Sequence, residues 1–307
     1  MLLVEHKYRP IRGEVLLLGR QVVLMTTTEA EALVDRMGIK RPSGSFVETG
    51  KIPNQFGREL ISDESFFSLF SDAVVSACDV SDHEAADFIF DLSAEVPHEL
   101  RGRFDFIYNG SVLDNVFDPA ACIRHVSKML KPDGVVMGYE GMAHAGAVYL
   151  KFTPEWFFDY YALNNFADFQ SYVFTYPDIH ADPVDTFEWS AFTDFGELAK
   201  PMPLDRDALV VAIAQNSPDA TIGKVPIQGV YRSGQHEAYK RAFERYAAST
   251  RRSALAAIFP PLAPPPMVPA PGIAGLLGKK RPAEMSPAVD GHRYLGKLGA
   301  PVFLGGT

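Results

Sequence analysis

Several apolar runs in the sequence end at a glycine or at a polar residue, and these residues have the types that bind ligands. The run 13–18 ends at Gly19, the run 73–78 ends at Asp79, and the short run 88–90 ends at Asp91. In an open parallel sheet, ligands bind outside the carboxyl ends of the strands. The candidate binding residues at that edge are Gly19, Arg20, Gln21, Asp79, Asp91, Asn109 and Gly110.

The two aspartates suit a nucleoside-like ligand. Asp79, after the second run, can accept hydrogen bonds from two ribose hydroxyls, and Asp91, after the third, can accept one from an adenine amino group. The alternative for both is a local role, because aspartate often caps turns. The residue types leave both roles open.

The turn after the first run distinguishes between cofactors. A dinucleotide needs a G-x-G-x-x-G turn, which lets the backbone approach a pyrophosphate. Here Gly19 is followed by Arg20, Gln21 and two valines, so the pattern disfavours NAD. S-adenosylmethionine has no phosphate and tolerates fewer glycines. Arg20 and Gln21 are candidates to hold its methionine carboxylate; the alternative is that they are turn residues facing solvent.

Strand-like runs alternate with helical segments, which favours a parallel sheet covered on both faces. The expected strands are 13–18, 73–78, 88–90, 104–108, 135–140, 168–176 and 207–215. The last two follow one another with little room for a helix between them, so we expect an antiparallel hairpin at one edge. The fold class is therefore α/β, a Rossmann-like, doubly wound and mostly parallel seven-stranded sheet.

Local signals place the helices between these strands. Thr26 with Glu29 and Thr28 with Glu31 are possible capping boxes before a helix that Gly38 closes. Asp118 is a good N-cap with proline at the first helical position. Further helices are expected at 62–70 and after Thr153.

The chain divides into three parts by composition. Residues 1–234 hold the sheet and its helices, and residues 235–258 form an amphipathic helix. Residues 259–307 are rich in proline, glycine and alanine, and we expect this tail to be disordered.

Three segments resemble class I S-adenosylmethionine-dependent methyltransferases, and the resemblance as a whole covers roughly residues 13–215. Residues 104–140 are similar to the fourth and fifth strand region of that superfamily, including its L-E-H-V-like and L-K-P-G-G-like segments. Residues 79–92 and 144–166 resemble segments of bacterial methyltransferase-like proteins. The resemblance implies S-adenosylmethionine as cofactor. The chain departs from the pattern at the first turn, where only Gly19 remains, and at Asn115, which replaces the usual histidine.

Methyl transfer to a hydroxyl needs a group that takes up the proton of the acceptor. Asn115 cannot do so at neutral pH. His144, just after the fifth strand, is the candidate base because the histidine pKa is near neutrality; the alternative is a surface or structural histidine. Tyr149 and Glu140 are candidates to position the acceptor. The aromatic set Trp156, Phe157, Tyr160 and Tyr161 has helical spacing, which favours core packing over a substrate pocket.

Composition and residue spacing exclude several classes of binding partner. The net charge of −9 argues against nucleic acid, because neutralising phosphates supplies most of that affinity. The two cysteines form no CxxC pair, the histidines lack ligand spacing, and no apolar run is long enough for a membrane span. We therefore expect a cytoplasmic protein without a metal site, acting on a small molecule.

The leading hypothesis is a methyltransferase for a hydroxyl or amine acceptor, with a sugar or polysaccharide precursor suggested by the resemblance. The second hypothesis is a methyltransferase-like binding or scaffold protein without turnover. It is motivated by the reduced glycine turn and by Asn115. The third is a nucleotide-dependent oxidoreductase, against which the missing G-x-G-x-x-G counts.

Overall fold

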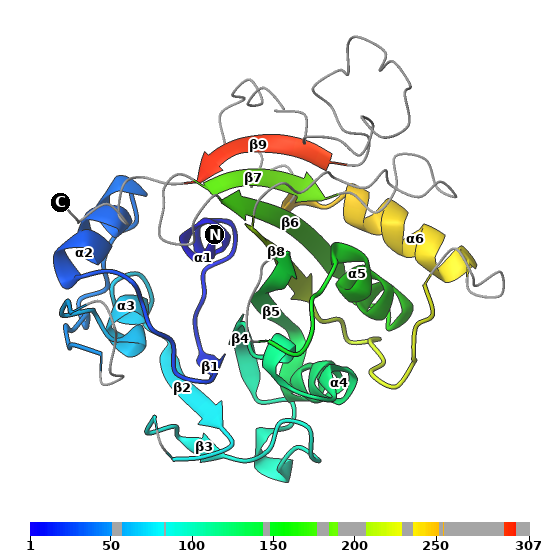
Figure 1. Ribbon diagram of the computed structural model, residues 1–307, viewed down its shortest axis with the longest axis horizontal. Helices are drawn as coiled ribbons and strands as arrows, with labels where there is room; N and C mark the ends of the chain where they lie inside the picture. The colour runs from blue at the N-terminus through cyan, green and yellow to red at the C-terminus, as the bar shows by residue number, and fades with distance from the viewer. Residues whose placement is uncertain are drawn as a thin grey trace, which may run out of the picture.

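The computed structural model describes residues 1–50, 57–82, 84–143, 148–176, 184–189, 207–228, 236–251, 254 and 292–298. These residues build one nine-stranded sheet with helices on both faces (Figure 1). The strand order is β3-β2-β1-β4-β5-β8-β6-β7-β9.

The first five strands are parallel neighbours and confirm the first five predicted strands. They are β1 (Glu14–Leu18), β2 (Val74–Asp79), β3 (Phe88–Ile89), β4 (Phe104–Gly110) and β5 (Leu130–Ala143). Leu18 at the end of β1 lies opposite Cys78 in β2 and Asn109 in β4. This register brings the ends of the three strands to one edge, which we call the binding edge.

The antiparallel part of the sheet is larger than predicted. β8 (Asp207–Gln215) pairs antiparallel with both β5 and β6 (Asp168–Tyr176), which confirms the predicted antiparallel pair. β7 (Val184–Trp189) and β9 (His292–Leu298) then extend the sheet by two strands that the sequence pattern did not indicate. β9 falls within the tail expected to be disordered. Residues 259–291 and 299–307 of that tail lie outside the described residues.

The helices begin where local signals predict. They are α1 (Leu2–Tyr8), α2 (Thr27–Arg36), α3 (Asp63–Ser68), α4 (Pro119–Met129), α5 (Pro154–Leu163) and α6 (His236–Ala247), with 3₁₀ turns η1 (His98–Leu100) and η2 (Leu113–Asn115). Thr26 and Glu29 form the capping box of α2, and the Asp118 carboxylate accepts from the backbone N–H of Ala121 at 2.9 Å. α1 was not predicted from the sequence.

Two apolar cores lie on the two faces of the sheet because successive side chains of a strand point to opposite sides. Leu16 and Leu18 of β1 face α4, α5 and α6, whereas Val15 and Leu17 face α1, α2 and α3. Three aromatic side chains of α5 are buried in the first core, which confirms the core interpretation for them: Phe157, Tyr160 and Tyr161.

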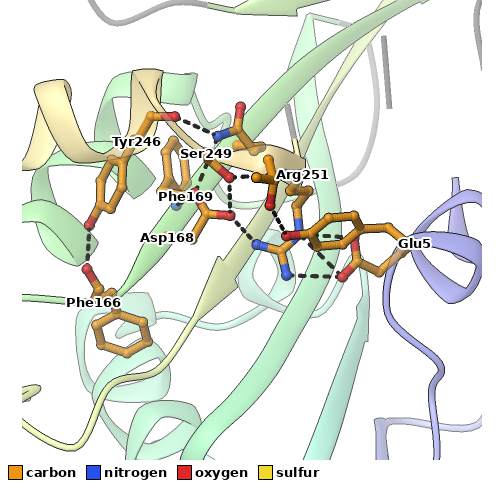
Figure 2. Close-up of polar contacts among 10 residues, drawn as sticks. Glu5, Phe166, Asp168, Phe169, Tyr246, Ser249 and Arg251 are labelled. Atoms are coloured by element: carbon orange, nitrogen blue, oxygen red, sulfur yellow. Dashed lines mark hydrogen bonds and ion pairs between the residues drawn. The ribbon is translucent and has the colours of Figure 1, made fainter. Parts of the chain in front are cut away.

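A buried ion cluster joins three distant parts of the chain (Figure 2). Arg251, which follows α6, donates to both carboxylate oxygens of Glu5 in α1 at 3.0–3.2 Å, and it also pairs with Asp168 at the start of β6. The Arg251 side chain is fully buried, and its guanidinium lies 4.9 Å from the ring centre of Tyr8. The cluster therefore fixes α1 and the chain after α6 against the sheet.

Candidate functional site

Gly19 presents bare backbone at the binding edge. Its φ of +69° is a left-handed conformation that glycine adopts without strain, and its N–H donates to Cys78 O at 2.8 Å. A methyl group added at Gly19 would lie 3.8 Å from Asp79 Oδ2 and 4.0 Å from Val112 Cγ2. A methyl group at this position would therefore be in ordinary van der Waals contact with both residues, and without it the backbone of Gly19 lies bare beside them.

Asp79 combines a local role with a free acceptor. Its Oδ1 accepts from the backbone N–H of Ser81 at 3.0 Å, which is the turn-capping role considered from the sequence. Its Oδ2 lies on the Gly19 side and accepts no hydrogen bond from the residues that the structure describes. One carboxylate oxygen is therefore available to a ligand.

Asp91 makes the same turn-capping contact as Asp79. Its Oδ1 accepts from Ser93 N–H at 2.8 Å, its backbone carbonyl accepts from Ala94 N–H at 2.9 Å, and the residue is exposed. The cap gives Asp91 a local role in the turn after β3, and its Oδ2, like that of Asp79, accepts no hydrogen bond from the described residues.

Arg20 is already neutralised by carboxylates of the chain. Its guanidinium pairs with Glu64 at 2.7 Å, with Asp87 at 3.0 Å and with Asp63 at 3.6 Å. These partners come from α3 and from the loop between β2 and β3. In this structure Arg20 ties those two segments together, and its charge is not directed at a ligand carboxylate.

Gln21 folds back onto the binding edge. Its backbone N–H donates to Asp63 Oδ2 at 2.9 Å. Its side-chain Nε2 donates to Leu18 O and to Gly19 O, both at 3.0 Å. A methyl group at Gly110 would overlap the Gln21 carboxamide, so that side chain lies across the edge between β1 and β4.

Arg20 and Gln21 also line a pocket beside this edge. Residues 22–23, 60–64 and 84–85 form much of the remaining wall, and Asp79, Asp91, Asn109 and Gly110 do not line it. The predicted binding residues therefore do not share one pocket.

Asn109 belongs to a buried polar network that the sequence did not reveal. Its Nδ2 donates to Glu140 Oε1 at 2.5 Å, and its Oδ1 accepts from Val112 N–H at 3.0 Å. Glu140 also accepts from the backbone N–H groups of Leu113 and Asp114, each at 3.0 Å. These contacts fix the loop that follows β4.

The Glu140 carboxyl is fully buried at the end of β5. Removal from water and the nearby Asp114 carboxylate raise the pKa of Glu140 to about 8, against the opposite effect of its three N–H donors. Asp114 Oδ2 in turn accepts from Ser111 Oγ at 2.7 Å and from Gly141 N–H at 3.1 Å. A glutamate that closes the apolar run of β5 was the one sequence signal for this network.

Of the residues considered for acceptor chemistry, Glu140 belongs to this network and Tyr149 lies on the surface beside it. His144 lies outside the described residues. Tyr149 is 71% exposed, and its ring packs edge-on against Phe117, which is 91% exposed, at a centroid distance of 6.3 Å. The backbone N–H of Tyr149 donates to Asp114 O at 2.9 Å, so this exposed aromatic pair is held beside the loop after β4.

The described residues also bear on metal binding and on membrane insertion. Among the residues that the structure describes, no group of three His, Cys, Asp or Glu side chains is arranged to hold a metal ion. In the same residues, no helix has the length and apolar character needed to cross a membrane.

The strand order decides the fold. Five parallel strands, β3-β2-β1-β4-β5, are followed by the antiparallel β8, which lies between β5 and β6. The chain has a Rossmann-like fold. No family model matches the chain, and no curated protein matches it.

Several solved structures that match the chain at low identity are S-adenosylmethionine-dependent methyltransferases. Phosphoethanolamine N-methyltransferase 2 of Haemonchus contortus is 12% identical over 71% of this chain and 52% of that chain, with a TM-score of 0.34. An S-adenosylmethionine-dependent methyltransferase of Thermotoga maritima is 12% identical over 70% of this chain and 88% of that chain, with a TM-score of 0.34.

The neighbours are not confined to methyltransferases. A Rhodobacter sphaeroides protein grouped with Zn-dependent alcohol dehydrogenases is 14% identical over 47% of this chain and 46% of that chain, with a TM-score of 0.27. For four of the solved structures that match, the chain spans only 36% to 52% of their length. The similarity concerns the fold alone.

Proposed function

We propose that the chain is an S-adenosylmethionine-dependent methyltransferase acting on a hydroxyl or amine group of a small molecule, such as a sugar or a polysaccharide precursor. The observation that carries this proposal is the bare backbone of Gly19, which lies beside Val112 and beside a carboxylate oxygen of Asp79 that accepts no hydrogen bond from the described residues. It lies at the carboxyl edge of the sheet, where ligands of such folds bind.

The residues at this edge fit a phosphate-free adenosine better than a dinucleotide. Asp79 Oδ2 can accept hydrogen bonds from ribose hydroxyls, and Gly19 leaves room for the chain of the cofactor. The turn offers one glycine, and the nearby Arg20 is already paired with carboxylates, so nothing there is arranged to receive a pyrophosphate. When bound, the cofactor would supply an electrophilic methyl group on a sulfonium.

The acceptor must lose a proton as its oxygen or nitrogen bonds to the methyl carbon and the carbon–sulfur bond breaks. Asn115 donates its amide to Ser111 O and to Asp114 Oδ1, and it cannot take that proton. Glu140 is enclosed by N–H donors of its own chain. His144 therefore remains the proposed base, and holding donor and acceptor in line supplies most of the catalysis.

Calorimetry with S-adenosylhomocysteine tests the cofactor proposal. Asp79→Asn keeps the oxygen that caps Ser81 and removes the charge, so we expect at least about tenfold weaker binding, or ~1.4 kcal/mol. Asp91→Asn is the matched control, because Asp91 caps a similar turn after β3, which β2 separates from Gly19 at the end of β1; the affinity of this variant should stay near that of the wild type. Absence of binding heat from the wild type would remove the proposal.

A binding protein without turnover is the second candidate. It is favoured by Arg20 and Gln21, which are both engaged with groups of their own chain. The discriminating test incubates the purified protein with labelled S-adenosylmethionine and cell extract. Tight binding without any labelled product would favour this candidate, and a labelled small molecule would favour the enzyme. A rise in melting temperature with NAD or NADP would instead revive the oxidoreductase hypothesis.

A further inference from the structure

The Gln21 side chain fills part of the binding edge. Its Nε2 donates to Leu18 O and Gly19 O at 3.0 Å each, so the carboxamide satisfies two carbonyl oxygens at the end of β1. The rest of the carboxamide lies against Gly110 at the end of β4, where any larger residue would overlap it. The absence of a side chain at Gly110 therefore makes this position possible.

The backbone of the turn is anchored, whereas the side chain of Gln21 is held by weaker and exchangeable contacts. Asp63 Oδ2 accepts from Gln21 N–H at 2.9 Å, and the neighbouring Arg20 pairs with Glu64 and Asp87. The carboxamide makes neutral hydrogen bonds only, and rotation about its side-chain torsions can move it without moving the turn. Leu18 O and Gly19 O then become available to another donor.

We propose that Gln21 is an internal plug of the cofactor site, whose carboxamide occupies the place of the ligand's ammonium group until the ligand displaces it. This inference rests on the proposed function. The methionine end of S-adenosylmethionine carries an ammonium with three N–H donors, which suits the two carbonyls that Gln21 now occupies. The ammonium N–H groups of the ligand then replace Gln21 Nε2 as the donors to Leu18 O and Gly19 O, so both carbonyls remain hydrogen-bonded when the ligand is bound.

The plug predicts a change in affinity that depends on the ligand. Gln21→Ala removes the carboxamide that competes with the ligand, so the protein no longer has to open the site before binding. S-adenosylhomocysteine should therefore bind to this variant about tenfold or more tightly than to the wild type. 5′-Methylthioadenosine lacks the amino-acid end, so its affinity should be the same in both proteins. Titration calorimetry of both compounds with both proteins gives the four values.

Each result has a definite meaning. Unchanged affinity of Gln21→Ala for S-adenosylhomocysteine overturns the plug, and weaker affinity assigns Gln21 to ligand binding instead. An equal gain for 5′-methylthioadenosine also overturns it, because the gain would then not concern the amino-acid end. If neither protein binds either compound, both the proposed function and the plug proposal fail. If the wild type binds S-adenosylhomocysteine and Gln21→Ala binds it no more tightly, only the plug proposal fails.

A stability cycle tests the geometry without any ligand. Gly110→Ala should lower the urea midpoint when Gln21 is present, because the added methyl overlaps the carboxamide. In the Gln21→Ala background most of that shift should be lost. An equal shift in both backgrounds would show that the carboxamide does not lie against Gly110, whereas loss of the shift supports the plug.

Discussion

Arg251 and Glu5 lie 246 residues apart in the sequence, yet they form a buried ion pair in which the guanidinium contacts both carboxylate oxygens. Asp168 shares the same guanidinium (Figure 2). One cation thus compensates two carboxylates, and burial together with the repulsion from Asp168 raises the pKa of Glu5 above its ordinary value against the effect of Arg251. The cluster depends on Arg251 more than on either acid.

We expect Arg251→Met to lower the free energy of unfolding by about 3–5 kcal/mol, because it leaves Glu5 and Asp168 buried without their cation. Urea denaturation followed by circular dichroism measures the loss. Arg101→Ala is the control, since its ion pair with Glu95 is exposed on both sides and such pairs contribute only ~0–1 kcal/mol. Similar losses for the two variants would contradict the central role of the cluster.

Glu140 should make stability depend on pH. Its pKa is about 8 in the folded chain and near 4.5 in the unfolded chain, so between these values the folded state keeps a proton that the unfolded state has lost. The contribution of Glu140 is therefore complete below about pH 4.5 and is lost as pH rises to about 8, with a slope of at most ~1.4 kcal/mol per pH unit.

Replacement of Glu140 by glutamine tests this dependence, because glutamine has nearly the same shape and does not titrate. Urea denaturation of both proteins between pH 5 and pH 8 should give a flatter profile for the variant, whatever its absolute stability. Parallel profiles for the two proteins would mean that Glu140 is ionised in the folded state throughout this range.

Asp118 should stabilise the start of α4 through its cap. Asp118→Ala removes the acceptor of Ala121 N–H, and we expect a loss of about 1 kcal/mol in the free energy of unfolding. Thr153→Ala is the matched control, because Thr153 also precedes a proline at the start of a helix but makes no capping hydrogen bond with its side chain. Equal losses from the two changes would show that the cap of α4 contributes nothing specific.

The sequence was most informative where structure depends on neighbours along the chain, although it did not indicate the short helix α1. The apolar runs ending at Gly19 and Asp79 became β1 and β2, and the signal of Asp118 followed by proline marked the start of α4. Strands and helix starts are set by local periodicity and capping, so a single sequence carries them.

Local sequence patterns could not predict which residues the side chains of the site contact. Arg20 meets Glu64 and Asp87, which come from segments 44 and 67 positions further along (64 − 20 and 87 − 20), and nothing at Arg20 itself indicates them. The fold-back of Gln21 depends on Gly110 in another strand. Such contacts arise only from the register of the assembled sheet.

The same limit explains the missed strands. β9 pairs with β7 from a position more than one hundred residues later, and the glycine-rich composition around it predicts no strand.

The position of β8 has a consequence for synthesis of the chain on the ribosome. Since β8 alone joins β6 to β5, a nascent chain that ends before residue 207 has an unpaired edge on β5 and a β6–β7 ribbon with no attachment to the sheet. Exposed strand edges of this kind invite pairing with other chains. Translational stalling in this interval should therefore be the moment at which the polypeptide most needs chaperone protection.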